Sequence, residues 1–415
     1  MKIAEIHARQ IYNSRGLPTI ACEIIFDNGS YVTSMVPSGA SVGQYEALEL
    51  CDGGERLMGK GVDLAITNIN EKISPLLIGR EINAVEMDQD LIELDGTPQK
   101  KVLGANATLA VSMALFKAHA SELGIELYDF IAQMLEFVEV SLPIPLINLI
   151  NGASHASNNL SIQEYLIIPF GVKSFAQAME VAVEIFHVLK KLLAQDGKLV
   201  LTGDEGGFAP DFKDDFEPLD YIMRAISEAG YDSSTVGLGL DVAASTFYDA
   251  EQKLYNLGDE FFSTLQLIEV YKKIAAKYPL MYLEDGLAET DWNGWIELRK
   301  QLGKEVRIIG DDLLATNIER IGLAAEKGAA NGAIIKPNQI GTVSEAIQAV
   351  LLCKEVGFST IASHRSGETC DSFIADFALG VNADYVKFGG CSHSERLAKY
   401  NRLLQIEYLR AVSRF

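Results

Sequence analysis

Residues 279–286 read Pro279-Leu280-Met281-Tyr282-Leu283-Glu284-Asp285-Gly286, an apolar run that ends in two adjacent carboxylates. A short apolar run of this kind is typical of a strand in a parallel sheet, which is buried on both faces. Two carboxylates at the end of a buried strand are costly unless a cation lies beside them. The segment therefore predicts a buried parallel strand whose tip takes part in function.

Five other segments repeat this pattern of an apolar run followed by polar or charged residues. They are 236–240 before Asp241, 307–310 before Asp311 and Asp312, 333–335 before Lys336, 358–362 before Ser363 to Gly367, and 383–386 before Lys387. Segments with helical periodicity, at 263–278, 292–302, 317–326 and 342–356, alternate with them. Successive strand–helix units with polar residues at the carboxyl ends of the strands predict an α/β fold, a TIM-type (β/α)8 barrel with its site on that face.

The N-terminal part of the chain is organised differently. Strands at 3–12, 19–26 and 31–36 come first, with Asp27-Asn28-Gly29 as a hairpin signal, and helices at 62–73, 84–94 and 105–122 follow. We expect an α+β capping domain over residues 1–138 and the barrel over residues 139–415, with Leu142-Pro143-Ile144-Pro145 at the crossing.

Composition narrows the class of protein. The formal net charge of -22 and the sequence pI of about 4.7 argue against nucleic acid or an anionic membrane as the main partner. The five cysteines are odd in number and lack CxxC spacing, so neither a disulfide framework nor a cysteine zinc site is expected. No apolar run approaches the roughly 20 residues of a membrane span, and the N-terminus has no signal-peptide pattern. We expect a cytoplasmic protein in a reducing compartment.

Three strand-tip carboxylates, Asp241, Glu284 and Asp311, would meet on one face of such a barrel, where their charges repel. Carboxylate oxygens from separate strands are the ligands that Mg²⁺ prefers, so a magnesium site is predicted. Each carboxylate could instead cap the helix that follows its strand. The three together, with Lys336 at the next tip, favour the metal.

Lys336 is the candidate base of this site. Because its ammonium should lie partly buried near a metal ion, we expect its pKa to be lowered until the amine can take a proton from the carbon next to a carboxylate. A lone lysine is more often an ion-pair partner, and only its place in the series of strand tips favours the functional interpretation.

Two polar loops complete the candidate site. Glu205 lies between Asp204 and the pair Gly206-Gly207, and it is a candidate general acid on a loop expected to close over the site, although alone it would be a turn residue. The tetrapeptide 364–367, His-Arg-Ser-Gly, offers a guanidinium, a hydroxyl and backbone N–H groups that suit a phosphate. By itself the tetrapeptide is weak evidence for a phosphate-binding site.

Longer blocks of the chain resemble the enolase family over nearly its whole length. The most specific are Gly203-Asp-Glu-Gly-Gly-Phe-Ala-Pro210 and Ser363-His-Arg-Ser-Gly-Glu-Thr369, and others are Val36-Pro-Ser-Gly-Ala-Ser41, Asn338-Gln-Ile-Gly341 and Ser394-Glu-Arg-Leu-Ala-Lys-Tyr-Asn401. The resemblance implies Mg²⁺-dependent, reversible dehydration of 2-phospho-D-glycerate to phosphoenolpyruvate by a homo-oligomer, a dimer or higher.

Carried over position by position, the resemblance implies a role for each site residue. Lys336 would remove the C2 proton, and Glu205, assisted by Glu164, would protonate the departing C3 hydroxyl. The catalytic set would be Glu205, Lys336, Glu164 and His364, the substrate-binding set His155, Gln163, Arg365, Ser366 and Lys387, and the metal-binding set Asp241, Glu284, Asp311 and Ser41. Two Mg²⁺ ions per site are implied, the second bound through the Ser41 loop once substrate is present.

The chain also departs from the family pattern, at Asn13, Leu17, Val42, Ala153, Ser157, Gly286, Phe388 and His393. None of these departures removes a charged site residue, but they gather near loops and near Lys387. Two alternatives therefore stay open. One is a divergent member of the family that acts on a related phospho- or phosphono-hydroxy acid. The other is a surface binding protein, located at the cell surface or secreted without a signal peptide. A dehydratase of non-phosphorylated hydroxy acids is disfavoured by Arg365 and Ser366.

Overall fold

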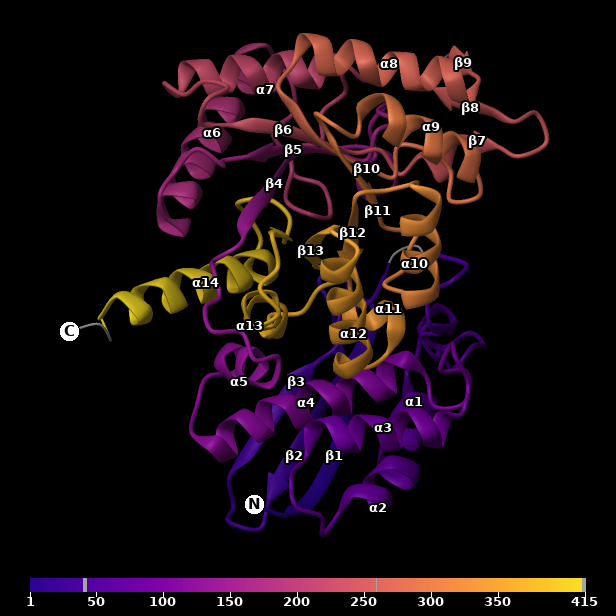
Figure 1. The fold of residues 1–415 in the computed structure, drawn as a ribbon, viewed down its shortest axis with the longest axis vertical. Coiled ribbons are helices and arrows are strands. Elements are labelled where there is room, and N and C mark those ends of the chain that lie inside the picture. Colours follow the sequence, from indigo (N-terminus) through magenta and orange to yellow (C-terminus); the bar gives the residue numbers. More distant parts are fainter. Residues whose placement is uncertain (40–42, 259, 413–415) are drawn as a thin grey trace.

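The computed structural model describes residues 1–39, 43–258 and 260–412. Figure 1 shows a smaller N-terminal part, indigo to magenta, packed against a larger part that contains a closed barrel. The chain ends in a long helix, α14 (Ser394–Val412), that extends from the side of the barrel.

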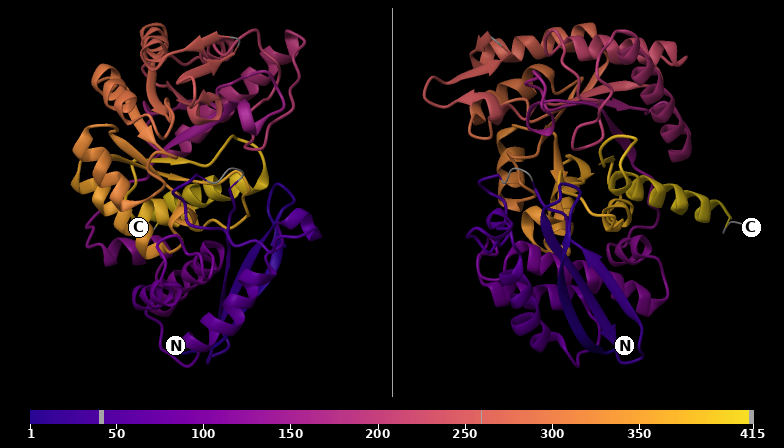
Figure 2. Two further views of the ribbon diagram at one scale, coloured as in Figure 1. Left: turned by 90° about the vertical axis from the view of Figure 1, so that its right-hand side faces the viewer. Right: turned by 180° about the vertical axis from the view of Figure 1, so that it is seen from behind.

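The N-terminal part is a three-stranded antiparallel sheet with helices on one face. Its strands are β1 (Ile3–Tyr12), β2 (Pro18–Phe26) and β3 (Tyr31–Met35), paired in the order β1-β2-β3. The predicted hairpin between β2 and β3 is present, and Gly29 supplies the positive φ of +82° that its turn requires. The helices are α1 (Asp63–Asn68), α2 (Ser74–Leu77), α3 (Ala84–Asp95), α4 (Ala105–Leu123) and α5 (Leu127–Met134). The right view of Figure 2 shows the sheet from behind, and α4 packs against β2 and β3.

The barrel closes through eight strands in the order β10-β11-β12-β13-β14-β4-β5-β6. They are β4 (Ile144–Asn151), β5 (Glu164–Ile168), β6 (Gly237–Asp241), β10 (Leu280–Glu284), β11 (Arg307–Gly310), β12 (Gly332–Ile335), β13 (Ser359–Ser363) and β14 (Tyr385–Lys387). All six strands expected from the repeated pattern are present, with ends shifted by a residue or two. One apolar layer fills the interior: Leu146, Leu166, Ile168, Tyr282, Ile309, Ile334 and Ile361.

The first two barrel strands depart from the strand–helix repeat. β4 and β5 are joined by a loop with a single 3-10 turn (Ala153–His155), and β5 runs antiparallel to both β4 and β6. Because β5 runs in reverse, its first residue, Glu164, lies at the same mouth of the barrel as the last residue of β6, Asp241.

Helices cover the outside of the barrel. They are α6 (Phe175–Gln195), α7 (Glu217–Glu228), α8 (Thr264–Lys277), α9 (Trp292–Leu302), α10 (Ile318–Lys327), α11 (Pro337–Ile340), α12 (Val343–Glu355), α13 (Phe373–Gly380) and α14. The four helices predicted between the later strands correspond to α8, α9, α10 and α12. A small antiparallel sheet, β7 (Tyr248–Asp249), β8 (Leu254–Leu257) and β9 (Glu260–Phe262), follows β6 and has no counterpart in the sequence prediction.

The N-terminal part reaches the barrel mouth through the segment that follows β3. Backbone N–H groups of Ser38 and Ala47 donate to the carbonyl oxygens of Gly367 (2.8 Å) and Gln339 (2.8 Å). A second contact joins the buried Lys100 ammonium to Glu345 Oε1 of α12, at 2.8 Å. The segment after β3 is therefore held against the loops that follow β12 and β13.

Candidate active site

The carboxyl ends of the parallel barrel strands converge on a cavity of about 60 Å³. Register explains the convergence: Glu284 pairs with Asp241 across β10 and β6, and Ser363 pairs with Lys387 across β13 and β14. The lining consists of Glu46, His155, Gln163, Glu164, Glu205, Asp241, Ala243, Thr246, Asp285, Asp311, Asp312, Lys336, Ser363, His364, Arg365, Ser366 and Lys387. It includes every site residue expected from the sequence except Glu284, which is buried directly beside it, and Ser41, which lies outside the described residues.

Lys387 is surrounded by three buried carboxylates. Its Nζ lies 2.7 Å from Asp241 Oδ2, 3.0 Å from Glu284 Oε1 and 3.2 Å from Glu164 Oε1. Burial lowers the pKa of this ammonium, but the three negative charges outweigh burial and raise the pKa well above its ordinary value. One cation does not offset them all, because burial and the Asp241 charge raise the pKa of Glu284 to about 8. Around Lys387, negative charge therefore exceeds positive charge.

Lys336 lies beside one of the predicted metal-binding carboxylates. Its ammonium contacts Asp311 Oδ2 directly, and Gln339 donates to the other oxygen of that carboxylate at 3.0 Å. Burial lowers the pKa of Lys336, and the charges of Arg365 and Lys387 act in the same direction. The Asp311 carboxylate outweighs them and raises the pKa above its ordinary value. The expected lowering was for a lysine beside a metal ion, and it stays a prediction; in the protein alone the nearest charge to Lys336 is negative.

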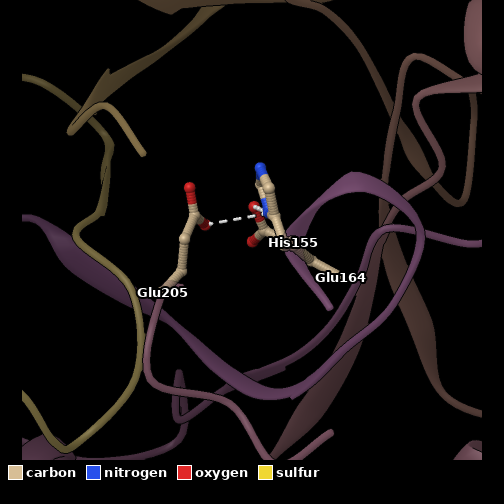
Figure 3. A group of neighbouring side chains, drawn as sticks. All are labelled: His155, Glu164 and Glu205. Atoms are coloured by element: carbon tan, nitrogen blue, oxygen red, sulfur yellow. Dashed lines mark ion pairs between the residues drawn. The ribbon is translucent and has the colours of Figure 1, made fainter. Parts of the chain in front are cut away.

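On the side of the cavity opposite Lys336, a histidine and two carboxylates face one another (Figure 3). His155 Nδ1 lies 3.5 Å from Glu205 Oε2 and 3.7 Å from Glu164 Oε1. Burial and the Glu205 charge raise the pKa of Glu164 well above its ordinary value. Burial also raises the pKa of Glu205, but the neighbouring His155 and His364 outweigh it and hold that pKa well below its ordinary value. Glu164 is therefore the carboxyl of this pair that holds a proton more tightly.

The loop after β13 carries the residues expected to face a phosphate. The Arg365 guanidinium is buried and lies 2.9 Å from Glu46 Oε2. Arg396, at the start of α14, fixes this loop from behind by donating to the carbonyl oxygens of Arg365 (2.5 Å) and Ser366 (2.7 Å) and to His364 Nδ1 (2.7 Å). Ser366 lines the cavity beside Arg365.

Sequence reasoning missed four residues that shape the site: Glu46, Asp285, Asp312 and Arg396. Asp285 and Asp312 are the second members of the doublets after β10 and β11, and only the first members had been assigned. The carboxyl oxygens of Asp285 accept the backbone N–H groups of Asp311 (3.0 Å) and Asp312 (2.8 Å), so Asp285 holds the neighbouring strand tip. Burial and neighbouring carboxylates raise the pKa of Asp312 to about 7.

Two groups of residues could hold a metal ion in the described part of the chain. Ligand atoms of Asp285, Asp311 and Asp312 lie within 4.8 Å of one another, as do those of His155, Glu164 and Glu205. The predicted set differs from both: Asp241 and Glu284 converge on Lys387, whereas Asp311 contacts Lys336.

The described residues that depart from the family pattern do not line the cavity. Phe388 is buried and packs on the Tyr400 ring with centroids 5.6 Å apart. His393 Nε2 lies 3.0 Å from the Thr202 hydroxyl, and the carbonyl of Gly286 accepts from the Tyr271 hydroxyl. Asn13 donates to Ser38, and Val42 lies outside the described residues. Nothing in the structure explains the choice of Leu17, Ala153 or Ser157.

Comparison with known proteins adds two kinds of finding. A family model described as "Enolase, C-terminal TIM barrel domain" matches residues 139–412, and one described as "Enolase, N-terminal domain" matches residues 3–131. The enolases of Helicobacter pylori strains HPAG1 and Shi470 are each 45% identical to this chain over 412 residues, which is 98% of the chain and 96% of the relative. Both the barrel and the N-terminal part are matched. The chain belongs to the enolase family.

Proposed function

We propose that this chain is a phosphopyruvate hydratase, which catalyses the Mg²⁺-dependent, reversible dehydration of 2-phospho-D-glycerate to phosphoenolpyruvate in glycolysis. One observation carries the proposal. Lys336 follows β12 and Glu164 begins β5, and these two strands lie opposite each other in the closed eight-strand barrel. A base and an acid on opposite walls suit the removal of a proton and a hydroxyl from opposite sides of one small molecule.

The first step is proton abstraction. Lys336, as the neutral amine, takes the C2 proton at Nζ, and the electron pair left at C2 moves into the substrate carboxylate. Lys387 binds that carboxylate, so its ammonium stabilises the negative charge that develops there. Lys387 is buried and the Lys336 side chain is only 13% exposed, which supports these roles, because a charge acts more strongly where water is excluded.

The second step is loss of the C3 hydroxyl. The electron pair returns to form the C2–C3 double bond, the C3–O bond breaks, and Glu205 donates a proton so that the hydroxyl leaves as water. The raised pKa of Glu164 beside the lowered pKa of Glu205 supports this role, because a proton on Glu164 can replace the one that Glu205 gives away. His155 and His364 flank Glu205 and keep its carboxyl in position.

The predicted metal-binding residues Asp241, Glu284 and Asp311 fit a divalent cation. The donors are carboxylate oxygens, which Mg²⁺ prefers, and the raised pKa of Glu284 marks uncompensated negative charge. Asp241, Glu284 and Asp311 would hold the first ion, and Ser41, which lies outside the described residues, would help to hold a second with substrate. A bound Mg²⁺ would supply positive charge that competes with Lys336 for the Asp311 carboxylate and so lowers the pKa of Lys336. The same charge would offset the negative charge that develops on the substrate carboxylate.

Arg365, Ser366 and His155 bind the phosphate. Gln163 and His364 also line the substrate cavity. The Glu46 contact supports the assignment of Arg365, because the guanidinium already donates to one anionic partner at the cavity. Arg396 is a positioning residue that fixes the Arg365–Ser366 backbone.

We further infer a homo-oligomer, a dimer or higher, in the cytoplasm, with the capping domain over residues 1–138 and the barrel over residues 139–415. The family resemblance supports the oligomer. All five cysteines are free, which suits a reducing compartment. Within residues 1–39, 43–258 and 260–412, no helix has the length and apolar character needed to cross a membrane.

The reaction can be followed directly by the ultraviolet absorbance of phosphoenolpyruvate. Purified protein with Mg²⁺ should convert 2-phosphoglycerate to this product, and glycerate without the phosphate should not react because Arg365 would gain no ligand. Absence of product in both reaction directions at high protein concentration would refute the proposal. It would favour a related substrate or a binding role.

A further inference from the structure

Thr316 lies in the turn between β11 and α10, and its backbone conformation is unfavourable for its residue type. Its φ is +53°, and that of Ala315 before it is +48°. A β-branched residue is rarely found in this left-handed region, where glycine fits without strain. Backbone strain of this kind persists where the surrounding structure requires it, and it is common at functional sites. The Thr316 side chain should therefore have a role that glycine cannot fill.

The Thr316 hydroxyl joins two groups that lie beside the site. The residue is 0% exposed. Its Oγ1 accepts the backbone N–H of Lys336 at 2.9 Å and donates to Gln339 Oε1 at 2.7 Å. Gln339 Nε2 donates to Asp311 Oδ1 at 3.0 Å, and the Lys336 ammonium contacts the other oxygen of that carboxylate. Four residues therefore form a closed ring of hydrogen bonds: Asp311, Thr316, Lys336 and Gln339.

Each hydrogen bond in this ring has one possible direction. A carboxylate paired with an ammonium only accepts hydrogen bonds, so Gln339 must present its NH₂ group to Asp311. The amide oxygen of Gln339 then faces Thr316, and because a carbonyl oxygen only accepts, the hydroxyl proton is used there. The Thr316 hydroxyl therefore sets the orientation of the Gln339 amide and, through the amide, that of the Asp311 carboxylate.

The ring connects three elements at the barrel mouth. Asp311 follows β11, Lys336 follows β12, and Gln339 belongs to α11. Thr316 is absent from the residues that line the cavity, so it can act on a substrate or a metal ion only through its neighbours. Those neighbours are the residue proposed as the base and one residue proposed to bind Mg²⁺.

We propose that Thr316 is a positioning residue that holds Lys336 and Asp311 in one fixed arrangement through its hydroxyl. The assignment to catalysis rests on the proposed function. Without the hydroxyl, the Lys336 N–H and Gln339 Oε1 would be buried without a partner. The Gln339 amide could then turn away from Asp311, and both the carboxylate and the base would lose their common support.

The test compares Thr316→Ser with Thr316→Ala, which differ by one oxygen and both lack the methyl group. Thr316→Ala should lower kcat for 2-phosphoglycerate by about 10- to 100-fold and weaken Mg²⁺ binding by about 10-fold, whereas Thr316→Ser should stay within about 3-fold of wild type in both. Isothermal titration calorimetry without substrate measures the Mg²⁺ affinity. This affinity depends on neither turnover nor the fraction of active protein.

Thr342→Ala is the matched control for loss of a buried threonine hydroxyl. Thr342 is also 0% exposed, and it exchanges hydrogen bonds with Glu345 at the start of α12, away from the residues that line the cavity. Its loss should lower the melting temperature and leave the Mg²⁺ affinity and kcat unchanged. A merely structural role for Thr316 would give the same result in Thr316→Ala.

A second variant, Gln339→Met, keeps the length of the side chain and removes its amide. It should weaken Mg²⁺ binding as much as Thr316→Ala does, and the double variant should bind Mg²⁺ no more weakly than Gln339→Met alone, because the hydroxyl acts on Asp311 through Gln339. If Thr316→Ala does not fold, as judged by circular dichroism, Gln339→Met provides the test. Unchanged Mg²⁺ affinity in Gln339→Met would then overturn the proposal.

Three other results would overturn the proposal. They are wild-type Mg²⁺ affinity and kcat in Thr316→Ala, equal losses in Thr316→Ser and Thr316→Ala, and additive weakening of Mg²⁺ binding in the double variant. A wild-type protein that binds Mg²⁺ but forms no phosphoenolpyruvate would instead refute the proposed function, and the comparison of Mg²⁺ affinities would still test the ring.

Discussion

Arg365 is the buried cation whose contacts must change when a phosphate enters the cavity. Burial lowers the pKa of its guanidinium, but Glu46 and Glu49 outweigh burial and raise the pKa, so the charge is permanent. The planar guanidinium has several N–H groups and can contact a carboxylate and a phosphate together, whereas the lysine ammonium is a compact point charge. The geometry of Arg365, as well as its charge, should therefore matter for substrate binding.

Replacing Arg365 by lysine should raise KM for 2-phosphoglycerate and lower kcat/KM by about 10- to 100-fold, which corresponds to one lost charged hydrogen bond. Steady-state kinetics over a range of substrate concentrations would measure the effect. Arg402→Lys is the matched control, because Arg402 pairs with Asp376 and Glu126 and does not line the cavity. An unchanged KM in Arg365→Lys would contradict the phosphate assignment.

At the residue scale, the sequence predicted the position of Lys336 but not its direct contact with Asp311. Position follows from its place at the end of an apolar run. The pKa depends on whether Asp311 lies closer to Lys336 than Arg365 and Lys387 do, and such distances between strand tips are not encoded locally. Glu46 and Arg396 were missed for a similar reason, since each meets its partner across a large separation in sequence.

At the element scale, α12 begins at a junction between the two parts of the molecule. Its N-terminal N–H groups are bound by side chains of the N-terminal part: Ser112 Oγ accepts from Val343 (2.9 Å) and Asp88 Oδ2 accepts from Ser344 (2.9 Å). Asp88 is fully buried, and burial raises the pKa of its carboxyl to about 6. The ionised carboxylate is therefore an energetic cost at neutral pH.

The raised pKa makes stability depend on pH through Asp88. Because the folded state holds this proton more tightly, the contribution to stability is full below the unfolded pKa of about 4 and is lost as pH rises through about 6. Asp88→Asn should therefore raise the free energy of unfolding at pH 7.5 by about 2 to 3 kcal/mol, with a smaller gain at pH 5. Urea denaturation at the two pH values tests this. A loss of stability at pH 7.5, or a gain that does not shrink at pH 5, would contradict it.

The direction of β5 is a second feature, besides the β7–β9 sheet, that the sequence did not predict. Residues 165–168, Tyr-Leu-Ile-Ile, are apolar throughout, and a short run buried on both faces looks the same in either direction. The later strands could be assigned because each is followed by charged residues and then by a helix of matching length. Before β5 there is only a polar loop, so the reversal depends on tertiary packing.

At the scale of the whole molecule, negative charge is the dominant feature. The chain carries a formal net charge of -22, and part of that charge is buried at the barrel mouth, where Glu284, Asp285 and Asp312 all have raised pKa values. Burial and mutual repulsion are the causes, and both oppose folding. An ion that binds only the folded state should relieve this cost and stabilise the whole chain.

Mg²⁺ should therefore raise the melting temperature relative to protein in chelator. Binding at about 100 times the dissociation constant contributes about 2.7 kcal/mol, or about 3 °C for a chain of this size. The shift should be much smaller in Asp311→Ala and unchanged in Asp220→Ala, which alters an exposed aspartate paired with Lys277. An equal shift in wild type and Asp311→Ala would contradict the metal assignment.

The most direct test of the opposed base and acid is exchange of the substrate C2 proton in deuterated water, followed by nuclear magnetic resonance of 2-phosphoglycerate with Mg²⁺. Lys336→Ala should abolish the exchange, because Lys336 is the proposed base that takes the C2 proton. Glu205→Gln should retain measurable exchange while forming no phosphoenolpyruvate, because the acid is needed only in the second step. Equal loss of exchange in both variants would contradict the division of roles between the two walls of the barrel.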